Sequence, residues 1–183
     1  GLAMVSASDA SLLPFSANNV IRNAGLDAAI LSLKSSGDDI YGTGYVFGAG
    51  GNLEGSFRAS WSSGDLVWVN DCHGDQYDVE PMGDTVYAAG HSHYCGSLEG
   101  GFPQSDPWSF YRGLAVSKDV ARTTPYGLNL GYYDFGGNPA PKLLHWFPAF
   151  NAGNVSGASQ GPWSVSSNLS LIHISEPTRR RGI

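Results

Sequence analysis

The sequence predicts an all-β fold, and both its composition and its internal repeats lead to that prediction. Gly (25) and Pro (10) are abundant in the 183 residues, of which 42% are hydrophobic, 12% aromatic and only 14% charged. A helical bundle would need far more Ala, Glu, Lys and Leu, and this turn-rich, aromatic composition is typical of β-sheets. We therefore expect one all-β domain with a buried core.

The first repeat is a hairpin pattern that occurs twice. Residues 31–45 align without gaps with residues 77–91 at an offset of 46, and each copy reads as a strand, a Gly-Asp turn and a second strand. A short turn that contains Gly between two strand-like runs indicates a β-hairpin. Residues 163–165 resemble the opening of both copies, so we expect a third copy to begin there.

A second hairpin-like pattern occurs at residues 1–9, 56–68 and 112–119, with starts about 56 residues apart. Two hairpins per unit make four strands per unit, which at a period of roughly 40–56 residues is typical of β-propeller blades. A single blade cannot bury both of its faces and needs neighbours. The sequence therefore predicts a partial β-propeller of about two to three four-stranded antiparallel blades. The alternative is a β-sandwich whose Gly-rich strands resemble one another by coincidence.

These units divide the chain into a propeller fragment and a tail. The fragment, residues 1–168, comprises a partial blade and hairpin (1–54), a blade (55–118), a long insertion (119–162) with a short apolar strand candidate at 143–148, and the start of the next blade (163–168).

The tail, 169–183, begins with eleven residues that match the translation of a transposase-type sequencing adapter. We expect it to be non-native and exclude it from fold reasoning; a natural basic tail is the alternative.

Charge and hydropathy exclude two classes of function. The net charge is −6 and the fragment has no basic patch, whereas a protein that binds nucleic acid through phosphates needs one. No apolar run approaches the roughly 20 residues of a membrane span. The motifs of serine hydrolases, P-loop proteins, zinc proteases and calcium loops are also missing, so no motif identifies an enzyme class.

The two cysteines, Cys72 and Cys95, are predicted to form a disulfide. If Glu80 faces Thr85 across the turn, Cys72 faces His93 and Cys95 lies two residues further along the same face. That diagonal pair is somewhat far apart for a disulfide, and one β-bulge would close the gap. A disulfide would indicate an oxidising compartment. Two reduced, buried thiols are the alternative.

Four residues around the same hairpin are candidate metal ligands, His73, Asp75, His91 and His93. Imidazoles together with a carboxylate can hold zinc, and a His-x-His spacing on a strand places both rings on one face. The same register puts His73 on the opposite face, so a three-histidine site would need a break in the register. The alternative is a set of hydrogen-bonded histidines without a metal, and we expect no other cofactor.

Aromatic residues in and beside the long connections are candidate ligand-binding residues, namely Trp108, Tyr132, Tyr133 and Trp146. Aromatic faces next to polar side chains suit sugars, because a pyranose ring offers C–H groups for stacking and hydroxyls for hydrogen bonds. The alternative is that these rings only fill the insertion and cap the fold.

Four runs of sequence, at residues 67–79, 90–95, 143–148 and 162–165, resemble a family of secreted actinobacterial β-propeller-like proteins of unknown function. The resemblance implies an extracellular or cell-surface repeat domain without catalytic residues. We therefore expect a non-catalytic recognition or scaffold module that binds carbohydrate or another protein and packs against the remaining blades of its parent chain. A glycan-active hydrolase or lyase with its site in the His/Asp cluster, and a purely structural repeat, are the alternatives.

Overall fold

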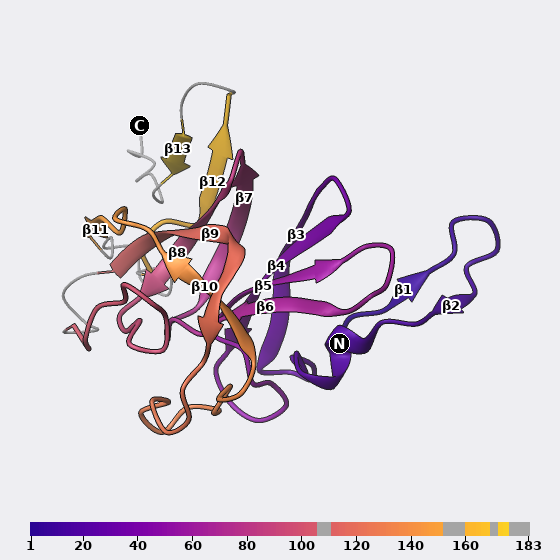
Figure 1. The fold of residues 1–183 in the computed structure, drawn as a ribbon, viewed down its shortest axis with the longest axis horizontal. Coiled ribbons are helices and arrows are strands. Elements are labelled where there is room, and N and C mark those ends of the chain that lie inside the picture. Colours follow the sequence, from indigo (N-terminus) through magenta and orange to yellow (C-terminus); the bar gives the residue numbers. More distant parts are fainter. Residues whose placement is uncertain (106–110, 152–159, 169–171, 176–183) are drawn as a thin grey trace, which may run out of the picture.

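The computed structural model describes residues 1–105, 111–151, 160–168 and 172–175, and this part of the chain is all-β (Figure 1). Its strands form antiparallel sheets, and the helical element in it is a short 3-10 turn, η1 (Ser16–Asn19). The predicted all-β class is confirmed. No sheet closes on itself within these residues.

The first large sheet is a four-stranded antiparallel meander. Its strands follow one another in the order β3 (Ala28–Ser36), β4 (Asp39–Val46), β5 (Gly55–Ser60) and β6 (Leu66–Asn70). The turn between β3 and β4 consists of two residues, and Gly37 adopts a φ of 64° there, which favours glycine over residues with a Cβ. The hairpins predicted at 31–45 and 56–68 are therefore confirmed.

The second large sheet repeats this meander. It runs through β7 (Gln76–Met82), β8 (Thr85–Ser92), β9 (Tyr111–Thr123) and β10 (Pro139–Leu143), and β11 (Ala149–Phe150) adds to the far part of β9. The fourth strand of this sheet comes from within 119–162, the segment expected to be an insertion. The expected apolar strand at 143–148 is wrong, because β10 already ends at Leu143.

Two smaller sheets complete the described chain. A hairpin of β1 (Met4–Val5) and β2 (Leu12–Leu13) projects from the N-terminal side, and β12 (Ser164–Ser167) pairs with β13 (Ile172–Ser175) (Figure 1). The strand β13 lies in the segment expected to be a non-native tail. The strand β12 begins where the third copy of the repeat was expected.

The predicted register of the second hairpin is wrong by two residues. Thr85 pairs with Met82 and not with Glu80, because the turn consists of Gly83 and Asp84 alone. A bulge between Gln76 and Asp78 shifts the register once more, and an isolated bridge then joins His73 to Tyr94.

The predicted disulfide between Cys72 and Cys95 is confirmed. The corrected register places the two cysteines directly opposite each other, with their Cα atoms 4.3 Å apart. Both side chains are fully buried in the core between the two large sheets.

Two hydrophobic cores hold these layers together. The larger core lies between the two large sheets, where Tyr41 and Trp68 of the first pack against Val79, Val86 and Leu114 of the second. The Trp68 Nε1–H donates to the Lys118 carbonyl at 2.8 Å, which ties β6 to β9. A smaller core on the other side of the first sheet is formed by Ala17, Ile21, Leu53, Phe57, Ala59, Val69 and Phe135.

Equivalent residues of the repeat touch one another across neighbouring sheets. The Ser32 hydroxyl donates to Asp78 Oδ1 at 2.7 Å, and the Ser164 hydroxyl donates to Asp78 Oδ2 at 3.1 Å. These three residues hold the same place in β3, β7 and β12, the strands that open the three copies. The three strands therefore lie side by side in their order along the chain.

Candidate functional site

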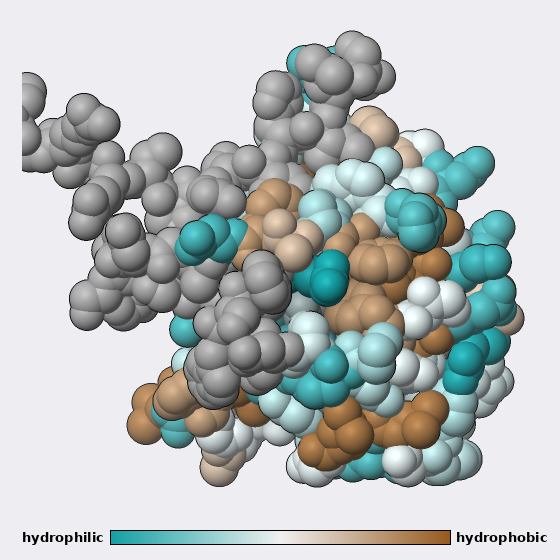
Figure 2. Space-filling model, turned by 90° about the vertical axis from the view of Figure 1, so that its left-hand side faces the viewer, coloured by the Kyte–Doolittle hydropathy of each residue, from teal (hydrophilic) through white to brown (hydrophobic). Residues whose placement is uncertain are grey.

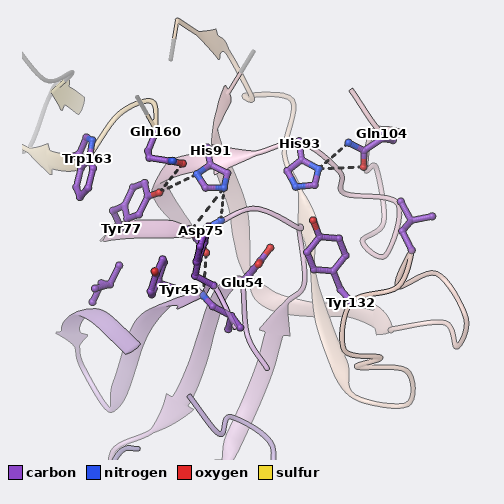
Figure 3. Close-up of a pocket in the computed structure, with 14 residues that line it drawn as sticks. Tyr45, Glu54, Asp75, Tyr77, His91, His93, Gln104, Tyr132, Gln160 and Trp163 are labelled. Atoms are coloured by element: carbon purple, nitrogen blue, oxygen red, sulfur yellow. Dashed lines mark hydrogen bonds and ion pairs between the residues drawn. The ribbon is translucent and has the colours of Figure 1, made fainter. Parts of the chain in front are cut away.

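The main candidate site is a cleft of about 750 Å³ where the two large sheets meet. It lies at the end of the sheets where β4 passes to β5, where β6 passes to β7 and where β8 ends, because alternate connections of a meander emerge at the same end. Figure 3 shows the rings and polar groups that surround it. Its lining consists of Leu31, Tyr45, Val46, Phe47, Glu54, Asp75, Tyr77, His91, His93, Gln104, Leu130, Tyr132, Gln160 and Trp163.

Glu54 and Asp75 form the acidic centre of the cleft (Figure 3). Glu54 Oε2 accepts the Gly74 backbone N–H at 3.2 Å, and Asp75 Oδ1 accepts the Val46 backbone N–H at 3.1 Å. Glu54 therefore reaches from the connection before β5 to the connection before β7, and Asp75 reaches from the latter to the end of β4. Gly74 has a φ of 111°, and a Cβ there would lie 2.4 Å from the His91 carbonyl oxygen, so only glycine fits.

The protein environment disfavours the charged form of these carboxyl groups. Burial raises the pKa of Glu54 to about 8, and the neighbouring charge of Asp75 adds to the rise. Burial also raises the pKa of Asp75 to about 6. Asp71, deeper in the protein, has a pKa near 8 because of burial and of the charges of Asp134 and Glu54. The carboxyl groups in and near the cleft therefore change their protonation state near neutral pH.

His91 links Asp75 to the rim of the cleft. Its Nε2 accepts the Asp75 backbone N–H at 3.2 Å, so the proton of the neutral ring is on Nδ1, which lies 3.0 Å from the Tyr77 hydroxyl. The Tyr77 hydroxyl in turn donates to Gln160 Oε1 at 3.4 Å. Burial lowers the pKa of His91 to about 4, so the ring is neutral at neutral pH.

The other two histidines among the predicted metal ligands, His73 and His93, lie beside His91. The His93 ring centroid is 6.4 Å from those of both His91 and His73, and His93 Nδ1 is hydrogen-bonded to the Gln104 side chain. His73 was expected on the opposite face, and the structure brings it close to His93. It is buried against Tyr132 at 4.3 Å, and neither ring nitrogen has a hydrogen-bond partner. Burial lowers its pKa to about 4.

The four predicted metal ligands thus gather around one end of the second sheet. In the described ranges, no three His, Cys, Asp or Glu side chains are arranged so that they could hold a metal ion. Both cysteines are in the disulfide and cannot act as thiolate ligands.

Aromatic rings form the walls of the cleft. Trp163, 42% exposed, stacks on Tyr77 with ring centroids 4.4 Å apart and an interplanar angle of 13°. Phe47, 81% exposed, lies parallel to Tyr45 at 6.5 Å. Tyr132 closes the opposite side, next to the histidines (Figure 3).

Of the four predicted ligand-binding aromatics, the structure places Tyr132 in the cleft. Tyr133 instead packs against Phe135 and under the Arg22 guanidinium, and Trp146 packs edge-on against Tyr87. Trp108 lies outside the described residues.

Equivalent positions of the repeat identify several residues of the cleft that are not among the predicted site residues. Leu31, Tyr77 and Trp163 are equivalent positions of the repeat, and all three line the cleft. Tyr45 and His91 are equivalent in the same way and line it too. A bulky side chain at the same repeat position in successive copies therefore indicates a residue that lines the cleft.

Asn23 positions Glu54 without touching the cleft. Its buried side-chain amide donates to the carbonyls of Ala29, Tyr45 and Leu53, and its Oδ1 accepts the backbone N–H groups of Asn52 and Leu53. The amide thus ties β3 and β4 to the connection that precedes β5. It holds both polar backbone groups of Leu53, the residue next to Glu54.

Replacing Asn23 with alanine is expected to lower the free energy of unfolding by about 2 kcal/mol, because buried backbone groups lose their partners. Urea unfolding followed by fluorescence would measure the loss. Asn19→Ala, at an exposed position of η1, is the matched control and should change stability by less than about 0.5 kcal/mol. Equal stability of the two variants would contradict the positioning role of Asn23.

No protein family, curated protein or solved structure matches this chain. Among the described residues, no helix is long and apolar enough to cross a membrane.

Proposed function

We propose that this chain is a non-catalytic recognition module that binds a glycan in the cleft between its two large sheets. The observation that carries the proposal is the pairing of stacked, exposed aromatic rings with a polar floor in one cavity of about 750 Å³. Trp163 and Phe47 offer flat apolar faces to sugar C–H groups. Gln104, Gln160 and the carboxyl groups of the floor offer hydrogen bonds to sugar hydroxyls.

Figure 2 shows one face of the molecule, on which apolar side chains gather in the middle and polar side chains lie around them. Small-molecule sites combine apolar walls with a few placed polar groups, as the lining of the cleft does.

We further propose that the two large sheets are successive blades of a β-propeller. In support, β7 packs against β3 and β4, β10 packs against β6, and β12 packs against β7, so equivalent strands stack on one another. The contacts of Asp78 with Ser32 and Ser164 repeat the same relation at single residues. A propeller gives this arrangement, because rotation about its axis relates each blade to the next.

An extracellular or cell-surface location belongs to the same proposal. The Cys72–Cys95 disulfide supports it, because such bonds persist in oxidising compartments. The remaining blades of a parent chain are the partners that the propeller proposal implies.

The glycan-binding proposal is tested by a glycan microarray followed by calorimetry with a glycan that the array retains. We expect Trp163→Ala to weaken binding at least 10-fold, because the stacking face is lost. Trp61→Ala is the matched control, since Trp61 is 57% exposed and lies outside the cleft, and it should bind as the unaltered chain does. A blank array, or equal binding by Trp163→Ala, would contradict the proposal, and a blank array would favour a purely structural repeat.

A glycan-active hydrolase is a second candidate, favoured by the two carboxyl groups of raised pKa in one cleft. A protonated Glu54 is suited to general acid catalysis near neutral pH, with Asp75 as the second carboxyl group. Release of reducing ends from the retained glycan, lost in Glu54→Gln, would favour this candidate. If the chain binds the glycan without hydrolysing it, the result would support the non-catalytic recognition module.

A further inference from the structure

We propose that the glycan recognised by the cleft carries a free amino group, and that its ammonium ion binds between Glu54 and Asp75. The inference rests on the proposed glycan-binding function and names the substrate class of the same site. Three observations support it, namely the unused oxygens of the two carboxyl groups, the charge of the cleft lining and the aromatic walls.

The first observation concerns hydrogen-bond acceptors. Glu54 uses Oε2 for the Gly74 N–H, and Asp75 uses Oδ1 for the Val46 N–H. In the described part of the chain, no protein group donates a hydrogen bond to Glu54 Oε1 or Asp75 Oδ2. Asp75 Oδ2 lies 3.9 Å from His91 Nε2, but that nitrogen already accepts the Asp75 backbone N–H and has no proton to donate. Each carboxyl group therefore presents one acceptor oxygen without a protein donor.

The two carboxyl groups lie close enough to act together. The charge of Asp75 raises the pKa of Glu54, and the charges of both groups contribute to a raised pKa of the Tyr132 hydroxyl. Figure 3 shows Glu54 between Asp75 and Tyr132. An ammonium group has three donors and no acceptor, which is the complement of two acceptor oxygens that face a common space.

The second observation concerns charge. The residues that line the cleft include two carboxyl groups and no Lys or Arg. Within the described ranges, no Lys or Arg side chain forms an ion pair with Glu54 or Asp75. Two histidines line the cleft, and burial lowers the pKa of both, that of His91 to about 4. Glu54 holds its proton at pH 6 before a ligand binds because its pKa is about 8, so binding of an ammonium ion favours the charged carboxylate and releases that proton. A uronate or sulfate group would instead meet two carboxyl groups and no cation to pair with.

The third observation concerns the rings. Tyr45, Phe47, Tyr132 and the Tyr77–Trp163 pair line the same cleft as the carboxyl groups. The negative faces of aromatic rings attract a cation within about 6 Å, and the attraction grows when the cation is desolvated. The C–H groups next to a ring ammonium are polarised by its charge and stack on such faces more strongly than those of a neutral sugar.

The test compares three oligosaccharides of the same length by isothermal titration calorimetry at pH 6 and low salt. These are β-1,4-linked glucosamine, its N-acetylated counterpart and β-1,4-linked glucose. We expect the glucosamine oligomer to bind at least 10-fold more tightly than the other two. Glu54→Gln should remove most of this preference, because the ammonium ion loses a partner that can carry a negative charge, whereas a lost hydrogen bond to a sugar hydroxyl would weaken all three oligomers alike. Glu99→Gln, on the surface and outside the cleft, is the matched control and should keep the preference.

The outcomes separate this inference from the proposed function. Equal or tighter binding of a neutral oligomer, or binding of the microarray's anionic glycans alone, would overturn the amino-group inference and leave glycan binding intact. A glucosamine preference that persists in Glu54→Gln would overturn the role of the carboxyl pair. Binding of none of the three, together with a blank microarray, would overturn the proposed function itself.

Discussion

Replacing Cys72 and Cys95 together with alanine is expected to lower the free energy of unfolding by about 3–5 kcal/mol and the Tm by about 10 °C. The disulfide spans 23 positions of sequence, and on the chain-entropy model a loop of that size contributes about 3 kcal/mol by restricting the unfolded chain. Both side chains are fully buried, so their truncation also removes packing from the larger core. Urea unfolding under oxidising conditions would measure the difference.

The same double variant should also weaken ligand binding. The disulfide joins the residue before His73 to the residue after Tyr94, and these two are themselves bridged. Loss of the bond therefore loosens the connections that carry Asp75 and His93. Unaltered protein treated with a reducing agent is the control and should approach the variant in stability. If the double substitution does not shift the unfolding midpoint, the disulfide does not stabilise the fold as expected.

Glu54→Gln is expected to stabilise the protein at high pH and to leave its stability near pH 5 almost unchanged. The pKa of Glu54 is about 8 in the folded chain and close to its ordinary value when the chain unfolds, so the folded state binds more protons between those two pH values. For such a group the free energy of unfolding falls as the pH rises through this window. Glutamine does not titrate, so at pH 9 the variant should be more stable by about 2–4 kcal/mol.

Urea unfolding of both proteins at pH 5 and pH 9 tests this expectation. The decisive quantity is the difference between variant and unaltered protein at each pH. Loss of the Glu54 charge also removes part of the rise in the pKa of Asp71, which adds to the expected stabilisation at pH 9. Glu99→Gln, half-exposed and paired with Lys142, should give a small difference that is similar at both pH values. A Glu54→Gln difference that does not grow from pH 5 to pH 9 would show that this carboxyl group is not held in its neutral form.

Local sequence signals predicted most of the fold. The Gly-Asp pairs at 37–38 and 83–84 mark two-residue turns, and the strand-like runs on both sides of each turn pair with each other. The disulfide could be predicted from the same hairpin. The exact register could not, because it depends on whether the turn takes two residues or four, and the bulge after Gln76 depends on contacts with the neighbouring strand.

The cleft was harder to predict, because its residues come from connections that only stacking of the two sheets brings together. Glu54 precedes β5 and belongs to no motif, yet it accepts the backbone N–H of Gly74 from the connection between the two large sheets. The place of Trp146 beside a long connection predicts a ligand-binding ring, whereas its ring packs on Tyr87. Trp163 and Tyr77 were visible as repeat-equivalent positions, but their stacking depends on how neighbouring copies face each other.

The contacts of Asp78 limit how alike successive copies can become. Its two carboxylate oxygens each receive a hydroxyl, one from the copy before and one from the copy after. A second aspartate at Ser32 or Ser164 would place two anions face to face and remove one hydroxyl donor from Asp78. Acidic and hydroxyl side chains must therefore alternate at this position from copy to copy. An aspartate at this position in adjacent copies would therefore weaken the contact that joins them.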